Sequence, residues 1–174
     1  MTYLDVQTPI RKTLPAGIAG FALFLAGAIS VAGVNLFGSR VGFGFVPFLV
    51  LILWPRRSNT LLSLALVFMA GFFTDWAVGG ILGQSTLLYV LVWGFLRPEL
   101  RSSPFSPARL FLVWLGTCGL ALIGFSLSGM FVLGIFPDIA SMGRQIILAS
   151  CLLPLVLLLR RGFEMWFNDR DDWG

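Results

Sequence analysis

The sequence predicts an all-α membrane protein: a bundle of six transmembrane helices in one domain that covers residues 1–174. Two observations support this fold class. First, 57% of the residues are hydrophobic and 11% are charged, whereas a soluble domain has about 25% charged residues. Second, the charged residues fall in short clusters between long apolar runs, which is how loops separate membrane spans. No loop is long enough to fold as a second domain.

The first two spans are predicted over 14–36 and 41–55. The first follows Arg11 and Lys12 and is longer than the apolar core of a cleaved signal peptide, ~7–15 residues, so we expect a retained helix. The second contains Pro47 and is short for a crossing that needs ~20 residues. It requires flanking residues, a locally thinned membrane or burial within the bundle. The segment is expected either to cross fully or to end within the bundle.

The third and fourth spans, 60–75 and 83–96, form a central pair in which Asp75 is the only charged residue between Arg57 and Arg97. Two full crossings of ~20 residues and a turn need more chain than this stretch provides. The glycine-rich turn is therefore expected to be short or partly embedded at the outer edge of the membrane. Irregular backbone at that depth needs cover from protein or from a water-filled cavity.

The last two spans are predicted over 110–136 and 139–159, the latter with Pro154 inside it and Arg144 near its outer end. The loop between Arg97 and Arg109 holds three prolines, which are expected to exclude a regular helix. This loop is either a solvated linker or a surface for a cytoplasmic partner or anionic lipid. The segment 160–167 either lies along the inner membrane surface or is the end of the last helix.

The distribution of basic residues predicts that both termini are cytoplasmic. With six spans and an inside N-terminus, only Arg40 and Arg144 of the twelve lysines and arginines lie outside. This bias follows the positive-inside rule for a bacterial inner membrane. The inside residues are Arg11, Lys12, Arg56, Arg57, Arg97, Arg101, Arg109, Arg160, Arg161 and Arg170.

Catalytic, metal and nucleic-acid functions are not indicated. The chain has no histidine, and Cys118 and Cys151 lie in separate apolar runs without a metal-type or redox-type spacing. No phosphate-binding or cofactor motif is present. The net charge of +4 comes from clusters at span ends and not from a binding stripe. We therefore expect no enzyme activity, cofactor or metal, and no nucleic-acid partner.

Asp75 and the glycines around it are the candidate structural or partner-binding site. Asp75 is interpreted either as a buried contact, paired with Arg144, Arg40 or a partner chain, or as a cap in water at a helix end. Gly71 shares its helix face. Gly79 and Gly83 have the spacing that lets helices approach closely, and flexible turn glycines are the alternative.

The order Gly71, Asp75, Gly79 and Gly83 between two apolar spans resembles the rod shape-determining protein MreD family, which has glycines four before and four and eight after an aspartate. A proline in the preceding span matches Pro47. A final apolar run that begins at Leu153-Pro154 and ends at Arg160-Arg161 is similar to the family's last helix. The long fifth span and the acidic end of the chain depart from the family pattern.

The resemblance implies a non-enzymatic scaffold of the bacterial cell-elongation machinery, which builds peptidoglycan in rod-shaped cells. It implies MreC as a binding partner, with MreB, RodA and a penicillin-binding protein nearby, in the bacterial inner membrane with its lipids. The alternative is a substrate-binding membrane subunit of an energy-coupling-factor vitamin transporter, in which Asp75, Trp76 and Gln84 would line an outward cavity. Outer polar groups that could recognise a vitamin are few in this chain.

Overall fold

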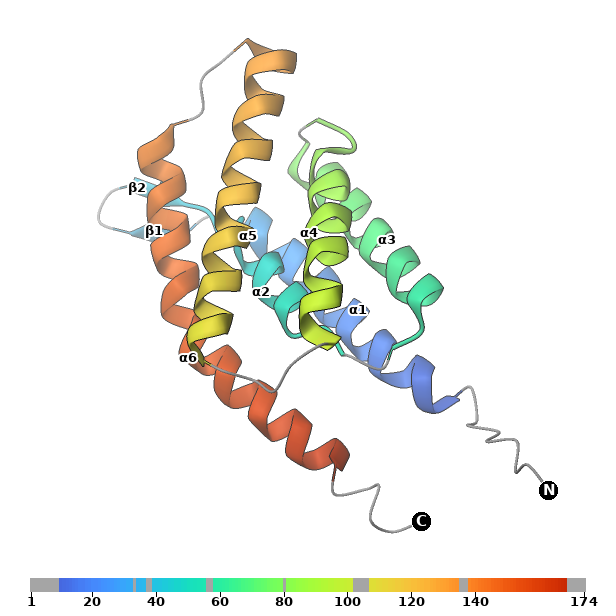
Figure 1. Cartoon of the computed structure of the whole chain (residues 1–174). Coiled ribbons are helices and arrows are strands. Elements are labelled where there is room, and N and C mark those ends of the chain that lie inside the picture. The colour runs from blue at the N-terminus through green and yellow to red at the C-terminus, as the bar shows by residue number, and fades with distance from the viewer. Residues whose placement is uncertain are drawn as a thin grey trace, which may run out of the picture.

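The computed structural model describes residues 10–32, 34–36, 39–55, 58–79, 81–101, 107–134 and 138–168. These residues form six α-helices and one short antiparallel hairpin (Figure 1). The elements are α1 Ile10–Val31, β1 Val34–Leu36, β2 Ser39–Val41, α2 Val46–Ile52, α3 Thr60–Val78, α4 Gln84–Arg101, α5 Pro107–Ser128, the π-helical turn η1 Gly129–Leu133, and α6 Ile139–Asn168.

The predicted helical membrane bundle is confirmed, and the chain is a multi-pass membrane protein. Four helical segments are long and apolar enough to cross a membrane. The apolar part of α4, Gln84–Leu96, is shorter, and α2 has only 7 residues. The four long segments are Thr13–Val31, Thr60–Val78, Ala108–Val132 and Ile139–Val156.

The boundaries predicted for the first two spans are wrong. Helix α1 ends at Val31, and the following residues form the hairpin β1–β2, in which Val34 pairs with Val41 and Leu36 pairs with Ser39. The prediction relied on hydropathy, which reports how apolar a segment is and not whether it is helical or extended. The predicted span 41–55 is thus a strand end, a turn and the short helix α2.

Helix α2 is the buried centre of the bundle and contacts α1, α4, α5 and α6. At ~1.5 Å per residue it is about 10 Å long, so it does not cross a membrane as a helix. Pro47 lies in its first turn, where the missing N–H removes no helical hydrogen bond. A helix that is apolar all round is expected in a core. Its buried side chains are Pro47, Phe48, Leu49, Leu51 and Ile52.

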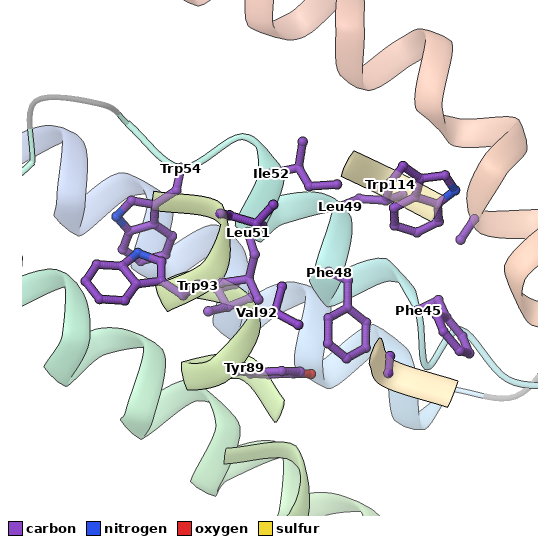
Figure 2. Close-up of a cluster of buried hydrophobic side chains, with 14 of the residues drawn as sticks. Phe45, Phe48, Leu49, Leu51, Ile52, Trp54, Tyr89, Val92, Trp93 and Trp114 are labelled. Atoms are coloured by element: carbon purple, nitrogen blue, oxygen red, sulfur yellow. The ribbon is translucent and has the colours of Figure 1, made fainter. Parts of the chain in front are cut away.

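Aromatic side chains from three segments meet around α2 (Figure 2). The ring of Phe48 packs edge-on against Tyr89 of α4, with centroids 5.3 Å apart, and against Phe125 of α5 at 6.5 Å. Phe45 completes the group at 5.8 Å from Phe48. Edge-to-face packing of this kind contributes ~0.5–1.5 kcal/mol per pair beyond area burial. The cluster joins α4 and α5 through α2.

Two further boundaries differ from the prediction. Helix α4 continues through Pro98 to Arg101, so the first part of the predicted loop 97–109 is helical, and residues 102–106 lie outside the described part. A proline this close to a helix end removes only one backbone bond. Helix α6 runs through Pro154 to Asn168, so the segment 160–167 continues the last helix.

Helix α3 packs against both α1 and α4, and Figure 1 shows α3 and α4 side by side. Close approach to α1 depends on two glycines: a Cβ on Gly20 would lie 2.9 Å from Leu66, and one on Gly27 would lie 2.5 Å from the Thr74 hydroxyl. Small residues at helix contacts are the usual packing solution in membranes. The remaining faces of α1, α3, α5 and α6 expose large apolar side chains, which suits contact with lipid.

Candidate functional site

Asp75 lies in the last turn of α3 and is buried, with 4% of its surface exposed. Its carboxylate accepts four hydrogen bonds, all from the start of α4. Oδ1 accepts from the backbone N–H of Ser85 at 2.7 Å. Oδ2 accepts from the N–H groups of Gly83 at 2.9 Å and Thr86 at 3.2 Å, and from the Thr86 hydroxyl at 2.9 Å.

The carboxylate therefore caps the N-terminus of the helix that follows its own. The first N–H groups of an α-helix have no partner within the helix and carry a partial positive charge. Gly83, the residue before α4, has no side chain that could cap them. Asp75 supplies the missing acceptor from the neighbouring helix and is itself stabilised by the helix dipole.

Of the two interpretations of Asp75, the structure supports the buried contact and not the cap in water. Among the described residues, however, its hydrogen bonds come from the start of α4 and not from an arginine. Arg144 lies 3.9 Å from Asp138, and both side chains are exposed. The side chain of Arg40 lies outside the described part of the structure. The sequence could not distinguish a cationic partner from a helix N-terminus, because both stabilise a buried carboxylate.

Gly71 lets the two helices come close enough for this contact. A Cβ at Gly71 would lie 2.5 Å from the Cα of Thr86 and 2.9 Å from its backbone nitrogen. Gly71 is one turn before Asp75, on the same face of α3. The close approach at Gly71 thus brings the first turn of α4 within reach of the carboxylate.

Gly79 and Gly83 are turn glycines and do not mediate close helix packing. Their φ angles are +66° and +93°, a region that other residues rarely adopt, and a Cβ on either would meet nothing within 4 Å. Gly79 ends α3, and its N–H donates to the carbonyls of Asp75 and Trp76. Of the two interpretations of this pair, the structure supports the turn.

A polar network extends from the cap into the bundle. Thr74, beside Asp75, donates its hydroxyl to the Ala70 carbonyl at 2.9 Å and is the hydrogen-bonding partner of the buried Tyr89 hydroxyl. On the other side, the Gln84 amide donates to the Ser128 hydroxyl of α5. The start of α4 is therefore linked to both α3 and α5.

The motif residues Gly71, Asp75, Gly79 and Gly83 form one unit, whereas Pro47 and Pro154 belong to α2 and α6. Sequence reasoning missed that Ser85 and Thr86 are the partners of Asp75. The run Gly83-Gln84-Ser85-Thr86 before an apolar segment was the available signal, because polar residues of this kind favour helix starts.

A second buried polar group, also missed, joins the segment after α2 to α3. The indole N–H of Trp54 donates to the hydroxyls of Ser58 at 3.2 Å and Ser63 at 3.1 Å. Ser63 donates to Ser58 at 2.9 Å, and Ser58 donates to the Pro55 carbonyl. This cluster satisfies the polar atoms of a tryptophan that is otherwise in an apolar core.

Within the described ranges, no group of three histidine, cysteine or acidic side chains is placed to hold a metal ion. Cys118 is buried in α5 and Cys151 is exposed on α6, and neither forms a disulfide. Comparisons with protein-family models, with curated proteins and with solved structures find no match.

Proposed function

We propose that the chain is a non-enzymatic scaffold of the bacterial cell-elongation machinery in the inner membrane, an MreD-like protein that binds MreC and acts beside MreB, RodA and a penicillin-binding protein. One observation carries the proposal. The residues on which the resemblance rests, Gly71, Asp75, Gly79 and Gly83, form a single structural unit at the α3–α4 turn. Each has a separate physical task there, as expected of a motif that acts as a whole.

The chemistry of this unit suits a scaffold. Both oxygens of Asp75 are engaged by backbone and hydroxyl donors of the same chain, so its role is to fix the relative position of two helices. A surface that is rigid before binding loses less conformational entropy when a partner docks. The exposed apolar faces of the bundle then offer such a partner's membrane helix a defined shape.

The vitamin-transporter alternative has less support from the same residues. It needs outer polar side chains that are available to a ligand. Asp75 and Thr86 are instead hydrogen-bonded to each other, and the Gln84 amide is bound to Ser128. Buried polar groups already paired within the chain gain little from a ligand.

The test is a tagged purification from native membranes in mild detergent, followed by mass spectrometry. We expect MreC and cell-wall synthases to be recovered with the unmodified chain and with Asp138→Leu, which alters an exposed acidic residue. Asp75→Leu should reduce their recovery at equal expression and should disturb rod shape. Recovery of ATPase subunits with a coupling membrane protein would contradict the scaffold proposal and support the transporter alternative.

A further inference from the structure

The lengths of α3 and α4 give two separate estimates of how deep the α3–α4 turn lies in the membrane. The apolar part of α4, Gln84–Leu96, is about 20 Å long at ~1.5 Å per residue. Along α3, the distance from Thr60 to Asp75 is about 22 Å by the same measure. The hydrocarbon core is ~30 Å thick. With the far ends of both helices at the inner boundary, the Asp75 cap lies about 8–10 Å below the outer boundary, and the end of α3 at Val78 lies about 3 Å below it.

Helix α5 shows that the rest of the bundle reaches further. Its apolar segment with η1, Ala108–Val132, is about 37 Å long at ~1.5 Å per residue, enough to cross completely. In Figure 1 its upper end extends beyond the α3–α4 turn. The outer end of α5 therefore extends further out of the membrane than the α3–α4 turn does.

Several polar backbone groups at the two ends of this turn have partners within the chain. Asp75 accepts from the first N–H groups of α4, and Gly79 donates to carbonyls of α3. The Gln84 N–H donates to the Ile81 carbonyl at 3.2 Å. Non-helical backbone at membrane depth requires such internal partners, because hydrocarbon provides none.

The side chains that the turn presents outward are apolar. Trp76, Val78, Leu82 and Leu87 are 72%, 56%, 65% and 63% exposed. The ring of Trp76 also lies against Phe73, with centroids 6.4 Å apart. A turn in water would be expected to expose polar side chains, whereas this one exposes apolar side chains and buries its one carboxylate, that of Asp75.

We infer that lipid acyl chains of the outer leaflet cover the α3–α4 turn, and that the Asp75 cap allows this turn to exist there without water. The inference does not depend on the scaffold role. It identifies an interaction surface, formed by Trp76, Val78, Leu82 and Leu87, whose partner is the lipid itself. Asp75 is a positioning residue for that surface, because it satisfies the N–H groups that would otherwise require water.

Nitroxide labels at single cysteines test the inference in vesicles of phosphatidylethanolamine and phosphatidylglycerol. The chain carries Cys118→Ala and Cys151→Ala, and a label is placed at Leu82, at Ile123 or at Asp138, which are 65%, 60% and 67% exposed. Collisions with oxygen, which partitions into hydrocarbon, are compared with collisions with a nickel chelate, which stays in water and is loaded on both sides. Ile123, in the second half of α5, is the lipid control, and Asp138 is the aqueous control.

We expect the Leu82 label to behave like the Ile123 label, with oxygen collisions dominant and nickel collisions several-fold below those at Asp138. Nickel collisions at Leu82 that equal those at Asp138 would place the turn in water and overturn the inference. Protection of Leu82 from both reagents would also overturn it, because a protein and not lipid would then cover the turn.

Asp75→Leu in the Leu82-labelled chain tests the role of the cap. Without the carboxylate the freed N–H groups recruit water, so nickel collisions at Leu82 should rise while those at Ile123 stay unchanged. Should Asp75→Leu fail to fold, Asp75→Asn keeps part of the cap and should give a smaller rise. Unchanged nickel collisions at Leu82 in a folded Asp75→Leu variant would show that the Asp75 cap does not keep water away from the turn.

Discussion

Asp75→Leu is the substitution whose effect the structure predicts most directly. It leaves three backbone N–H groups and the Thr86 hydroxyl without their acceptor, in a place where Asp75 is 4% exposed. Leucine keeps the branched shape of the side chain but has no polar atom, and its methyl groups are larger than the carboxylate oxygens, so the change removes the cap and also crowds the start of α4. The expected result is a loss of stability located at the α3–α4 contact.

The size of the loss follows from the four hydrogen bonds. At ~0.6 kcal/mol each, the mean for bonds between helices in a membrane, they contribute about 2.4 kcal/mol. Bonds to a charged group measured in water-soluble proteins, ~1.5–3 kcal/mol each, would give more. The higher figure overestimates the loss, because leucine does not incur the cost of burying a charge. We therefore expect a loss of ~2–5 kcal/mol in the free energy of unfolding.

Asp75→Asn refines the prediction because it keeps one oxygen acceptor. With that oxygen at the position of Oδ2, the bonds from Gly83 and from Thr86 persist, and the amide NH₂ faces the N–H of Ser85. One lost bond to a buried donor costs ~1–3 kcal/mol. The ranking in unfolding free energy should be unmodified chain, then Asp75→Asn, then Asp75→Leu.

The assay is unfolding in mixed micelles with a rising proportion of a denaturing detergent, followed by tryptophan fluorescence. The matched control is Asp138, which caps α6 through the Ala140 N–H at 3.1 Å but is exposed. An exposed cap contributes ~0.5–2 kcal/mol, so Asp138→Leu should cost less than Asp75→Leu. Equal losses at the two positions, or no difference between Asp75→Leu and Asp75→Asn, would refute the buried-cap argument.

Three further predictions use the same assay. Gly71→Ala should lower the free energy of unfolding by ~1–3 kcal/mol, because its Cβ meets the backbone of α4. The control Gly94→Ala, where a Cβ meets nothing, should be neutral or stabilising. Equal effects of the two substitutions would contradict the close approach of α3 and α4 at Gly71. Gly83→Ala should lower the free energy of unfolding by ~1–3 kcal/mol through backbone strain alone, because φ is +93° at this position. An unchanged midpoint of the unfolding transition would show that the turn changes its backbone conformation to accept alanine. Trp114→Phe should lose ~1 kcal/mol with its 2.9 Å bond to Ser150, and about as much again from the cavity left in a fully buried site. Ser150→Ala should add little further to Trp114→Phe, and full additivity would indicate that the bond contributes nothing.

The sequence located the candidate site but not its bonding. Asp75 stood out as the only charge in the central stretch, and Gly71 was placed on its face by helical periodicity. The partner of Asp75 was not predictable, because a buried carboxylate is stabilised equally by a cation or by helix N–H groups. Which of these is within reach depends on how closely α3 and α4 pack, and the approach at Gly71 determines that distance.

Composition and charge spacing by themselves determined that the chain is a helical membrane bundle, since an apolar chain with clustered charges has no stable soluble alternative. Only the tertiary structure decided that residues 34–36 and 39–41 pair as antiparallel strands, that α2 is a buried half-length helix, and that Asp75 caps α4. The physical reason is shared by all three. Hydropathy records how much a segment avoids water, whereas backbone conformation and hydrogen-bond partners depend on which other segments fill the space around it.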